Sequence, residues 1–241
     1  MTTSDKIEVI RMMRMWLILM FLAVNLAALP AAAVEKAIAT RWHDQLVTTT
    51  RMLEGGAYKD ALQPLKSLIH DILSKIEGGD ESYALAAPLI QRAIAEEGMG
   101  DHAAALWHWD MAQTLFPGAA NADLSSFGAP GEMLKRNLLP NPNPPSCTHQ
   151  RSTDPSAKVV KTIEPEYPEG ARLSRQSGIV IMNVTVAADG SISEPRVVKP
   201  LSAPLTFAAL EGTRLWTFAP AMVDGKPVAS NYCLTVNFRL R

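Results

Sequence analysis

The sequence predicts an α+β protein in which helical hairpins are followed by a small domain of β-β-α-β order. The C-terminal domain, residues 158–241, is predicted from residues 178–187 and 228–241, where apolar and polar side chains alternate as in half-buried strands. The helical part, residues 34–117, holds longer helical segments separated by short turns rich in glycine. Residues 118–157 are rich in Gly, Pro, Asn and Ser and form the predicted linker.

The composition excludes several classes of function. The chain has 241 residues, of which 47% are hydrophobic and 20% are charged, so it has room for two modest domains. Its formal net charge of -1 offers no basic face for nucleic acid. The sequence holds no metal-protease histidine pair, no nucleophile elbow and no phosphate-binding glycine loop. We therefore expect neither an enzyme nor a bound cofactor or metal, and no nucleic-acid partner.

Residues 1–33 are predicted to export the chain. Lys6, Arg11 and Arg14 give a basic start, residues 16–29 form an apolar run, and a small-residue end of alanines follows. These are the parts of a secretory signal peptide, with cleavage expected after the last of those alanines. An uncleaved membrane anchor is the alternative, although the apolar stretch is at the short limit for crossing a bilayer and contains a proline.

The helical part, residues 34–117, is predicted to consist of two hairpins. The first joins helices over residues 42–53 and 58–76, and the second joins helices over residues 83–97 and 102–116. Because a short turn that contains glycine links each pair, its two helices are expected to lie antiparallel and side by side.

The second hairpin resembles a tetratricopeptide repeat. Small residues at Ala93, Ala105 and Ala112, an aromatic residue at Trp109 and a closing Pro117 match the packing positions of that repeat. Small residues let two helices approach, and the aromatic ring fills the space toward the next helix. The resemblance implies a domain that binds peptides or proteins on its concave side. A generic four-helix bundle is the alternative interpretation.

The C-terminal domain is expected to contain a β-hairpin. Strands over residues 178–187 and 191–199 are separated by Asp189-Gly190, and Asp-Gly between two alternating runs predicts a type I′ turn. Pro195 has no N–H to donate to a sheet, so the second strand is predicted to be an edge strand or to carry a bulge.

A helix over residues 204–215 and a final strand over residues 228–241 complete the predicted domain. Pro204 suits the first turn of the helix, because the missing N–H would be unpaired there anyway. The side chains of the final strand that are expected to face one side together are Tyr232, Leu234, Val236, Phe238 and Leu240. Trp216 and Phe218, which follow the helix, are expected in the core.

Seven short pieces of the C-terminal domain occur in a recognisable order. They are Tyr167-Pro168 with Ala171-Arg172, Gly178-Ile179-Val180, Asp189-Gly190, Ala208-Ala209-Leu210, Trp216-Thr217-Phe218-Ala219-Pro220-Ala221, Gly225-Lys226-Pro227 and Phe238-Arg239-Leu240. Together they make this domain similar to the C-terminal domain of the TonB energy-transducer family. The resemblance implies a β-β-α-β module in the periplasm of Gram-negative bacteria. There it would pass inner-membrane energy to outer-membrane receptors for transmembrane transport, by gripping a short receptor peptide.

The site implied by this resemblance is the free edge of the final strand. A partner segment would add to that edge as a further strand, held by main-chain hydrogen bonds. The partner-binding residues expected there are Asn231, Cys233, Thr235, Asn237 and Arg239. Tyr167 and Pro168 either belong to the partner groove or fill the core of the domain. A second copy of the chain is an alternative partner for the same edge, and would give a homodimer.

The two cysteines, Cys147 in the predicted linker and Cys233 in the final strand, are candidates for a disulfide. In an oxidising compartment two otherwise lone cysteines tend to pair. Two free thiols are the alternative.

Other polar and aromatic residues are expected to have no special role. The histidines, His108 among them, are expected at the surface, and the adjacent acids Glu96 and Glu97 are expected on a solvated face. Trp107 and Trp109 are two residues apart on one helix and cannot share a face, so one is expected inside and the other exposed.

Two functions follow from the resemblance. An energy transducer would keep an anchor in the inner membrane and contact motor proteins there. The anchors of the family usually carry a serine and a histidine, and residues 16–33 contain neither. The predicted linker reaches at most ~130 Å when fully extended. The alternative is a periplasmic adaptor without energy coupling, in which the two domains hold two different protein partners.

Overall fold

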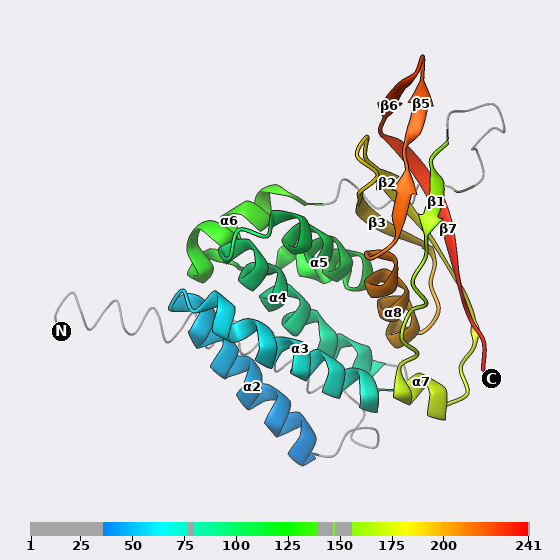
Figure 1. Cartoon of the computed structure of the whole chain (residues 1–241). Helices are drawn as coiled ribbons and strands as arrows, with labels where there is room; N and C mark the ends of the chain where they lie inside the picture. Colours follow the sequence, from blue (N-terminus) through cyan, green and yellow to red (C-terminus); the bar gives the residue numbers. More distant parts are fainter. Residues whose placement is uncertain (1–35, 77–79, 139–146, 148–155, 241) are drawn as a thin grey trace.

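The computed structural model describes residues 36–76, 80–138, 147 and 156–240. Helices α2 to α6 form one domain, and a β-sheet domain with helices α7 and α8 packs beside it (Figure 1). The predicted α+β class, with helices first and a small sheet domain after them, is confirmed. The export segment predicted at residues 1–33 lies outside the described ranges. Within those ranges, no helix is both long enough and apolar enough to cross a lipid bilayer.

The helical domain contains two hairpins, as the glycine turns predict. Their helices are α2 (Lys36–Glu54), α3 (Tyr58–Lys75), α4 (Ala86–Gly98) and α5 (His102–Leu115). Short 3₁₀ segments occupy Asp80–Leu85, Pro117–Asn121 and Ser125–Phe127. Gly56 and Gly100 follow the first helix of each hairpin with φ of 78° and 80°, a left-handed conformation that glycine adopts without strain.

The core of this domain is built from the apolar faces of its helices. Its largest fully buried side chains include Trp42, Leu53, Leu65, Leu89, Trp109 and Met111. The small residues that match a tetratricopeptide repeat, Ala93, Ala105 and Ala112, are all fully buried. At the end of α4, a Cβ on Gly98 would lie 2.4 Å from the ring of Tyr58, which begins α3. The absence of a side chain at Gly98 therefore lets the two hairpins pack this closely.

The predicted linker, residues 118–157, begins as part of the helical domain instead. Its helix α6 (Gly128–Arg136) packs against α4. Leu134 is fully buried, and the indole N–H of Trp109 donates to the backbone carbonyl of Asn137 at 3.0 Å. A few apolar residues give this stretch a buried face, so its glycine- and proline-rich composition does not mark the end of the domain.

The C-terminal domain is organised around a three-stranded antiparallel sheet in the order β3-β2-β7. Its strands are β2 (Gly178–Val186), β3 (Ile192–Lys199) and β7 (Ser230–Phe238), and helix α8 is Ala203–Thr213. The apolar face that meets the helix is fully or almost fully buried at Val180, Met182, Val184, Val186, Leu234, Val236 and Phe238. The predicted β-β-α-β order is therefore observed.

Several short elements flank this sheet. They are β1 (Lys158–Lys161) paired with β4 (Thr217–Ala219), β5 (Ala221–Val223) paired with β6 (Lys226–Val228), and α7 (Glu169–Leu173). Phe218 is buried as expected, whereas Trp216 is half-buried and donates its indole N–H to the carbonyl of Ile163 at 2.9 Å. Leu240, expected to share the buried face of the last strand, lies beyond its end and is exposed.

The two Asp-Gly dipeptides of the domain form different turns. Asp224 and Gly225 both have positive φ, 50° and 74°, in the two-residue turn between β5 and β6. At Asp189-Gly190 only the glycine has positive φ. The backbone N–H of Ala187 donates to the carbonyl of Ser191, the residue that follows this glycine. The predicted type I′ turn is therefore wrong at this position. The loop has three residues and ends on a left-handed glycine, the next most common way to close a hairpin.

Replacing Gly190 by alanine is expected to lower the free energy of unfolding by at least about 1–2 kcal/mol. A non-glycine residue in the left-handed region costs about this much by itself. The new Cβ would also lie 2.2 Å from the carbonyl oxygen of Phe218, a backbone atom that cannot rotate away. Urea unfolding of the full chain measures the loss. Gly118→Ala is the matched control, because no atom lies within 4 Å of its Cβ position, and a similar loss in both variants would contradict the explanation.

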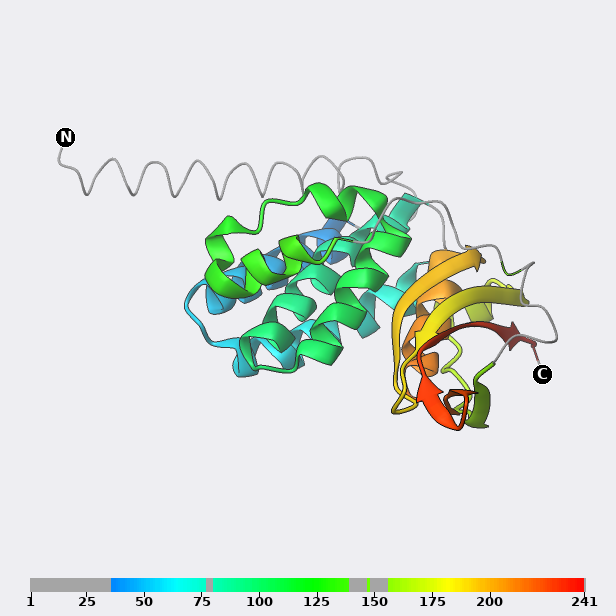
Figure 2. The same ribbon diagram turned by 90° about the horizontal axis from the view of Figure 1, so that it is seen from above.

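The two domains meet along one side of the sheet domain. Helix α5 packs against β3 and α8, and α3 packs against α7 (Figures 1 and 2). The contact at α7 is tight, because a Cβ on Gly170 would lie 2.4 Å from the carbonyl oxygen of Ile76. Thr114 of α5 donates its hydroxyl to the carbonyl of Pro195 in β3 at 3.1 Å. The helical domain therefore covers part of the β3 edge of the sheet.

Candidate functional site

The β7 edge is the candidate site, and its backbone is regular. β7 pairs with β2 over nine successive residues, from Gly178 opposite Phe238 to Val186 opposite Ser230. Because the sheet order ends at β7, the outer edge of this strand has no strand partner among the described residues. Unpaired N–H and C=O groups along such an edge can hydrogen-bond to an incoming extended chain.

The predicted contact residues lie on the polar face of β7. Asn231, Thr235 and Asn237 are exposed there, and Arg239 is exposed just beyond the end of the strand. Asn231 also belongs to a hydrogen-bonded row across the sheet, because the hydroxyl of Thr185 in β2 lies 3.4 Å from its side-chain oxygen. This face is therefore polar and solvated, in contrast to the apolar face under α8.

Tyr167 and Pro168 do not join this polar row. The ring of Tyr167 packs edge-on against Phe238, with ring centroids 5.5 Å apart, on the apolar side of β7. Its hydroxyl donates to the carbonyl of Gln176, and burial raises the pKa of the phenol. Pro168 is buried. Of the two alternatives for these residues, the structure places them in the packing of the domain.

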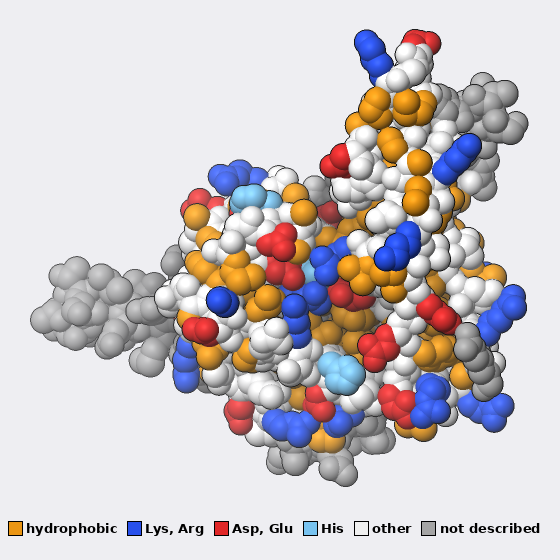
Figure 3. Space-filling model, viewed as in Figure 1, with side chains coloured by type: hydrophobic (Ala, Val, Ile, Leu, Met, Phe, Trp, Pro, Cys, Tyr) orange, Lys and Arg blue, Asp and Glu red, His pale blue; other side chains and the backbone are white. Residues whose placement is uncertain are grey.

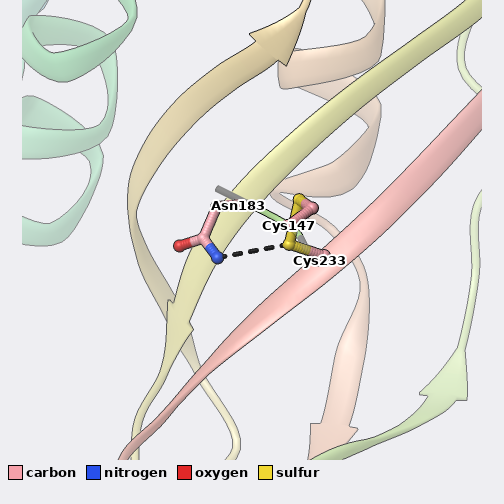
Figure 4. Close-up of a disulfide and its surroundings, with 3 residues drawn as sticks. All are labelled: Cys147, Asn183 and Cys233. Atoms are coloured by element: carbon pink, nitrogen blue, oxygen red, sulfur yellow. Dashed lines mark hydrogen bonds between the residues drawn. A yellow bond between two sulfur atoms is a disulfide. The ribbon is translucent and has the colours of Figure 1, made fainter. Parts of the chain in front are cut away.

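Cys233 is joined to Cys147 by a disulfide with an S–S distance of 2.06 Å, and the two positions are 86 residues apart in sequence (Figure 4). The bridge attaches Cys147 to the middle of β7. The side-chain amide of Asn183, opposite Cys233 on β2, donates to the Cys233 sulfur at 3.4 Å. Cys233 is therefore held by the disulfide. The exposed side chains of Asn231, Thr235 and Asn237 lie before and after it along β7.

The opposite edge of the sheet, formed by β3, is irregular. The pairing of β3 with β2 is interrupted by two register shifts, and Glu194 has a positive φ of 51°. Pro195 follows it, which confirms the predicted edge position with a bulge. Since α5 also covers β3, regular strand pairing is favoured at β7.

A buried cluster of ionisable residues, which the sequence analysis missed, lies where the domains meet. His108 of α5 has no exposed surface, and both of its ring nitrogens contact carboxylates. Its Nδ1 contacts Glu96 of α4, and its Nε2 lies 2.7 Å from Oε1 of Glu211 in α8. Arg92 of α4 lies 3.1 Å from an oxygen of each of these two carboxylates. Acidic and basic side chains gather in the hollow between the two domains (Figure 3).

Burial and the neighbouring charges act on the pKa of Glu211 in opposite directions. Burial by itself raises the pKa of Glu211, but the hydrogen bond and charge of His108, with the charges of Arg92 and Arg214, outweigh it and lower the pKa to about 2. Asp110, 7% exposed, lies two residues after His108. Its burial, helped by the nearby Glu194 carboxylate and opposed by Arg196, raises its pKa to about 7.

The expectations for surface histidines and solvated acids are therefore wrong at His108 and Glu96. Both Trp107 and Trp109 are buried as well, so neither is exposed. The signal was present in α5, where apolar residues occupy nearly the whole circumference between positions 103 and 112. A helix without a polar face is buried on all sides. Its few ionisable residues must then be buried too, and must find partners.

Comparisons with known proteins find similarity in the C-terminal part of the chain, which holds the sheet domain. Residues 163–240 match the family described as "Gram-negative bacterial TonB protein C-terminal". A protein TonB of Vibrio cholerae is 29% identical over 106 residues, which is 41% of this chain and 43% of that protein. The chain thus spans less than half the length of this relative. The solution NMR structure of a Pseudomonas aeruginosa TonB C-terminal domain aligns with 37% of this chain and 91% of its own, at 24% identity and a TM-score of 0.32.

The family match begins just before Tyr167 and ends with the last described residue of the chain. It includes the central sheet, α8 and the open β7 edge. Residues 163–240 of this chain are therefore a domain of the TonB C-terminal family.

Proposed function

We propose that this protein is a TonB-family component of the Gram-negative cell envelope. In this proposal its C-terminal domain faces the periplasm and binds an extended segment of a partner protein by strand addition along β7. A segment of an outer-membrane receptor is the partner that fits TonB-type energy transduction for transport. If the N-terminal segment stays in the inner membrane, motor proteins there are the second partner.

The observation that carries the proposal is the difference between the two edges of the sheet. β7 offers nine residues in regular register with β2 and an outer edge without a strand partner in the described part of the chain. β3 is bulged, and α5 packs against part of it. Main-chain hydrogen bonds along a regular edge provide affinity that depends little on partner sequence. The polar side chains of Asn231, Thr235 and Asn237 would then border the added strand.

A periplasmic adaptor without energy coupling is the second candidate, and the contact between the domains favours it. Because residues 118–138 pack with the helical domain, only the chain between Leu138 and Ser156 connects the two domains. That stretch reaches at most about 60 Å when extended, and its Cys147 is fixed to β7. The sheet domain is therefore held close to the helical domain, which suits an adaptor that presents two binding surfaces together.

Site-specific photo-cross-linking in a Gram-negative host tests strand addition. A photoreactive amino acid is placed at Asn231 or Thr235 in β7. The matched control is Ser193, which is exposed on β3 at the other edge. We expect the two β7 positions to cross-link to one short segment of an outer-membrane receptor, at sites about four residues apart. Such spacing is expected because paired strands advance together, residue by residue.

Two outcomes would contradict strand addition: cross-links from Ser193 as strong as those from β7, or β7 cross-links scattered over the receptor surface. The same cells, treated with a protonophore, separate the two candidate functions. A transducer is expected to change its receptor cross-linking when the proton gradient is lost. An adaptor is expected to keep it unchanged.

A further inference from the structure

The contact between the two domains contains ionisable groups from both of them, most of them buried. We propose that these groups form a pH-dependent clasp, which holds the sheet domain on the helical domain under mildly acidic conditions and loosens as the pH rises. The clasp consists of Arg92, Glu96, His108 and Asp110 from the helical domain and Glu211 from α8. This proposal does not rest on strand addition at β7.

The geometry of His108 gives the first reason. Each of its ring nitrogens lies within hydrogen-bond distance of a carboxylate, Glu96 on one side and Glu211 on the other. Ionised carboxylates accept hydrogen bonds and have no proton to donate. Both contacts are therefore hydrogen bonds only when both ring nitrogens carry protons. Loss of one proton breaks one bond and leaves a buried carboxylate facing a lone pair.

The charge balance around His108 supports the same direction. The charged groups in direct contact around it are Glu96 and Arg92 from α4 and Glu211 from α8, and Arg214 acts only on the Glu211 carboxylate. Within this contacting set, Arg92 and a protonated His108 balance the two carboxylates. Without that proton His108 can donate to only one of the two carboxylates, and its hydrogen bond is no longer strengthened by a positive charge. The bond between His108 and Glu211, which links the two domains, is then weaker.

Asp110 gives a second, independent contribution. It is buried beside β3, and the charged groups that face it there are Glu194 and Arg196. Burial, aided by the Glu194 carboxylate and opposed by Arg196, raises its pKa from the ordinary 3.8 to about 7. Because α5 packs against β3 here, the docked state is expected to hold this proton more tightly than the separated state. The resulting stabilisation of docking is complete below the ordinary pKa. It is lost as the pH rises through about 7.

Glu211 sets the acidic limit. Its pKa of about 2 lies below its ordinary value of 4.5, so its contribution is present above the ordinary value and is lost only as the pH falls toward 2. The two shifts together place the strongest docking in the mildly acidic range and the weakest at alkaline pH. Release would uncover the β3 edge and leave the sheet domain attached through the short chain between Leu138 and Ser156.

Hydrogen–deuterium exchange of the full chain tests the clasp. Amide protection in β3 and α8, corrected for the intrinsic rate, is compared at about pH 5 and about pH 8, with the radius of gyration from small-angle scattering. We expect at least about a tenfold loss of protection at the higher pH, because the Asp110 shift spans several pKa units. Asp110→Asn removes the charge that would be buried at the higher pH, and it is expected to lose clearly less protection between the two pH values than the parent chain, the remaining loss being the part that depends on His108. Asp189→Asn is the matched control, an exposed acid at the far hairpin.

The histidine is tested in the same way. His108→Gln cannot donate to both carboxylates and is expected to lower protection already at about pH 5, while His102→Gln, on the exposed start of the same helix, is expected to behave as the parent chain. The proposal is overturned if the parent chain is equally protected at both pH values. It is also overturned if Asp110→Asn and Asp189→Asn respond alike. If His108→Gln fails to fold, the comparison of Asp110→Asn with Asp189→Asn tests the proposal alone.

Discussion

Replacing Trp109 by alanine is expected to lower the free energy of unfolding of the helical domain by about 3–5 kcal/mol. Trp109 is fully buried, and its indole N–H donates to the carbonyl of Asn137 after α6. Alanine would leave a cavity beneath the segment that composition alone assigns to a linker. Urea unfolding followed by far-UV circular dichroism measures the loss. Release of α6 would appear as faster amide exchange over residues 128–136.

Two further variants separate packing from hydrogen bonding. Trp109→Phe keeps most of the volume and loses the donor, so a loss of about 1 kcal/mol is expected. Met99→Ala, at a residue that is 41% exposed, is expected to change stability by no more than about 0.5 kcal/mol. If Trp109→Ala changed stability no more than Met99→Ala, α6 would not be part of the helical core.

Removing the disulfide is expected to lower the free energy of unfolding of the sheet domain by about 4–5 kcal/mol. The bond between Cys147 and Cys233 closes a loop of 86 residues, and the chain-entropy model gives this size for the freedom that the unfolded chain regains. The double variant Cys147→Ser with Cys233→Ser tests it in urea unfolding, monitored by amide exchange in β2 and β7.

The control is chemical reduction. A thiol reductant is expected to destabilise the parent chain by a similar amount and to leave the double serine variant unaffected. A reductant effect that persisted in the serine variant would show that the loss does not come from this bond. Strand addition at β7 is expected to survive in both forms, because nine residue pairs with β2 also hold β7 in register.

The elements that the sequence predicts well are those whose pattern is local. Alternation in β2 and β7 and the glycines after α2 and α4 depend only on neighbouring residues. The bounds of these elements lie within a few residues of the predicted ones, except that α2 begins at Lys36 and not at residue 42. The open edge at β7 follows from the family resemblance together with the order of the strands.

The features that the sequence does not predict depend on residues far apart in the chain. Asp189-Gly190 and Asp224-Gly225 are the same dipeptide, yet only the second forms the two-residue turn. At Gly190 the carbonyl of Phe218 lies where a side chain would be, so a distant strand helps to set the loop. In the same way, Glu211 is 103 residues from His108. The local sequence around either residue does not indicate that the other is its partner.

The Cys147–Cys233 bond also determines how a mechanical load would pass through the molecule. A pull that arrives along the chain from Leu138 reaches Cys147 and crosses the disulfide directly to β7. The 86-residue loop between the sulfur atoms stays outside this covalent path. Unfolded, that loop would extend by about 300 Å. The bond therefore lets tension reach the strand with the open edge without first unravelling β2, β3 and α8.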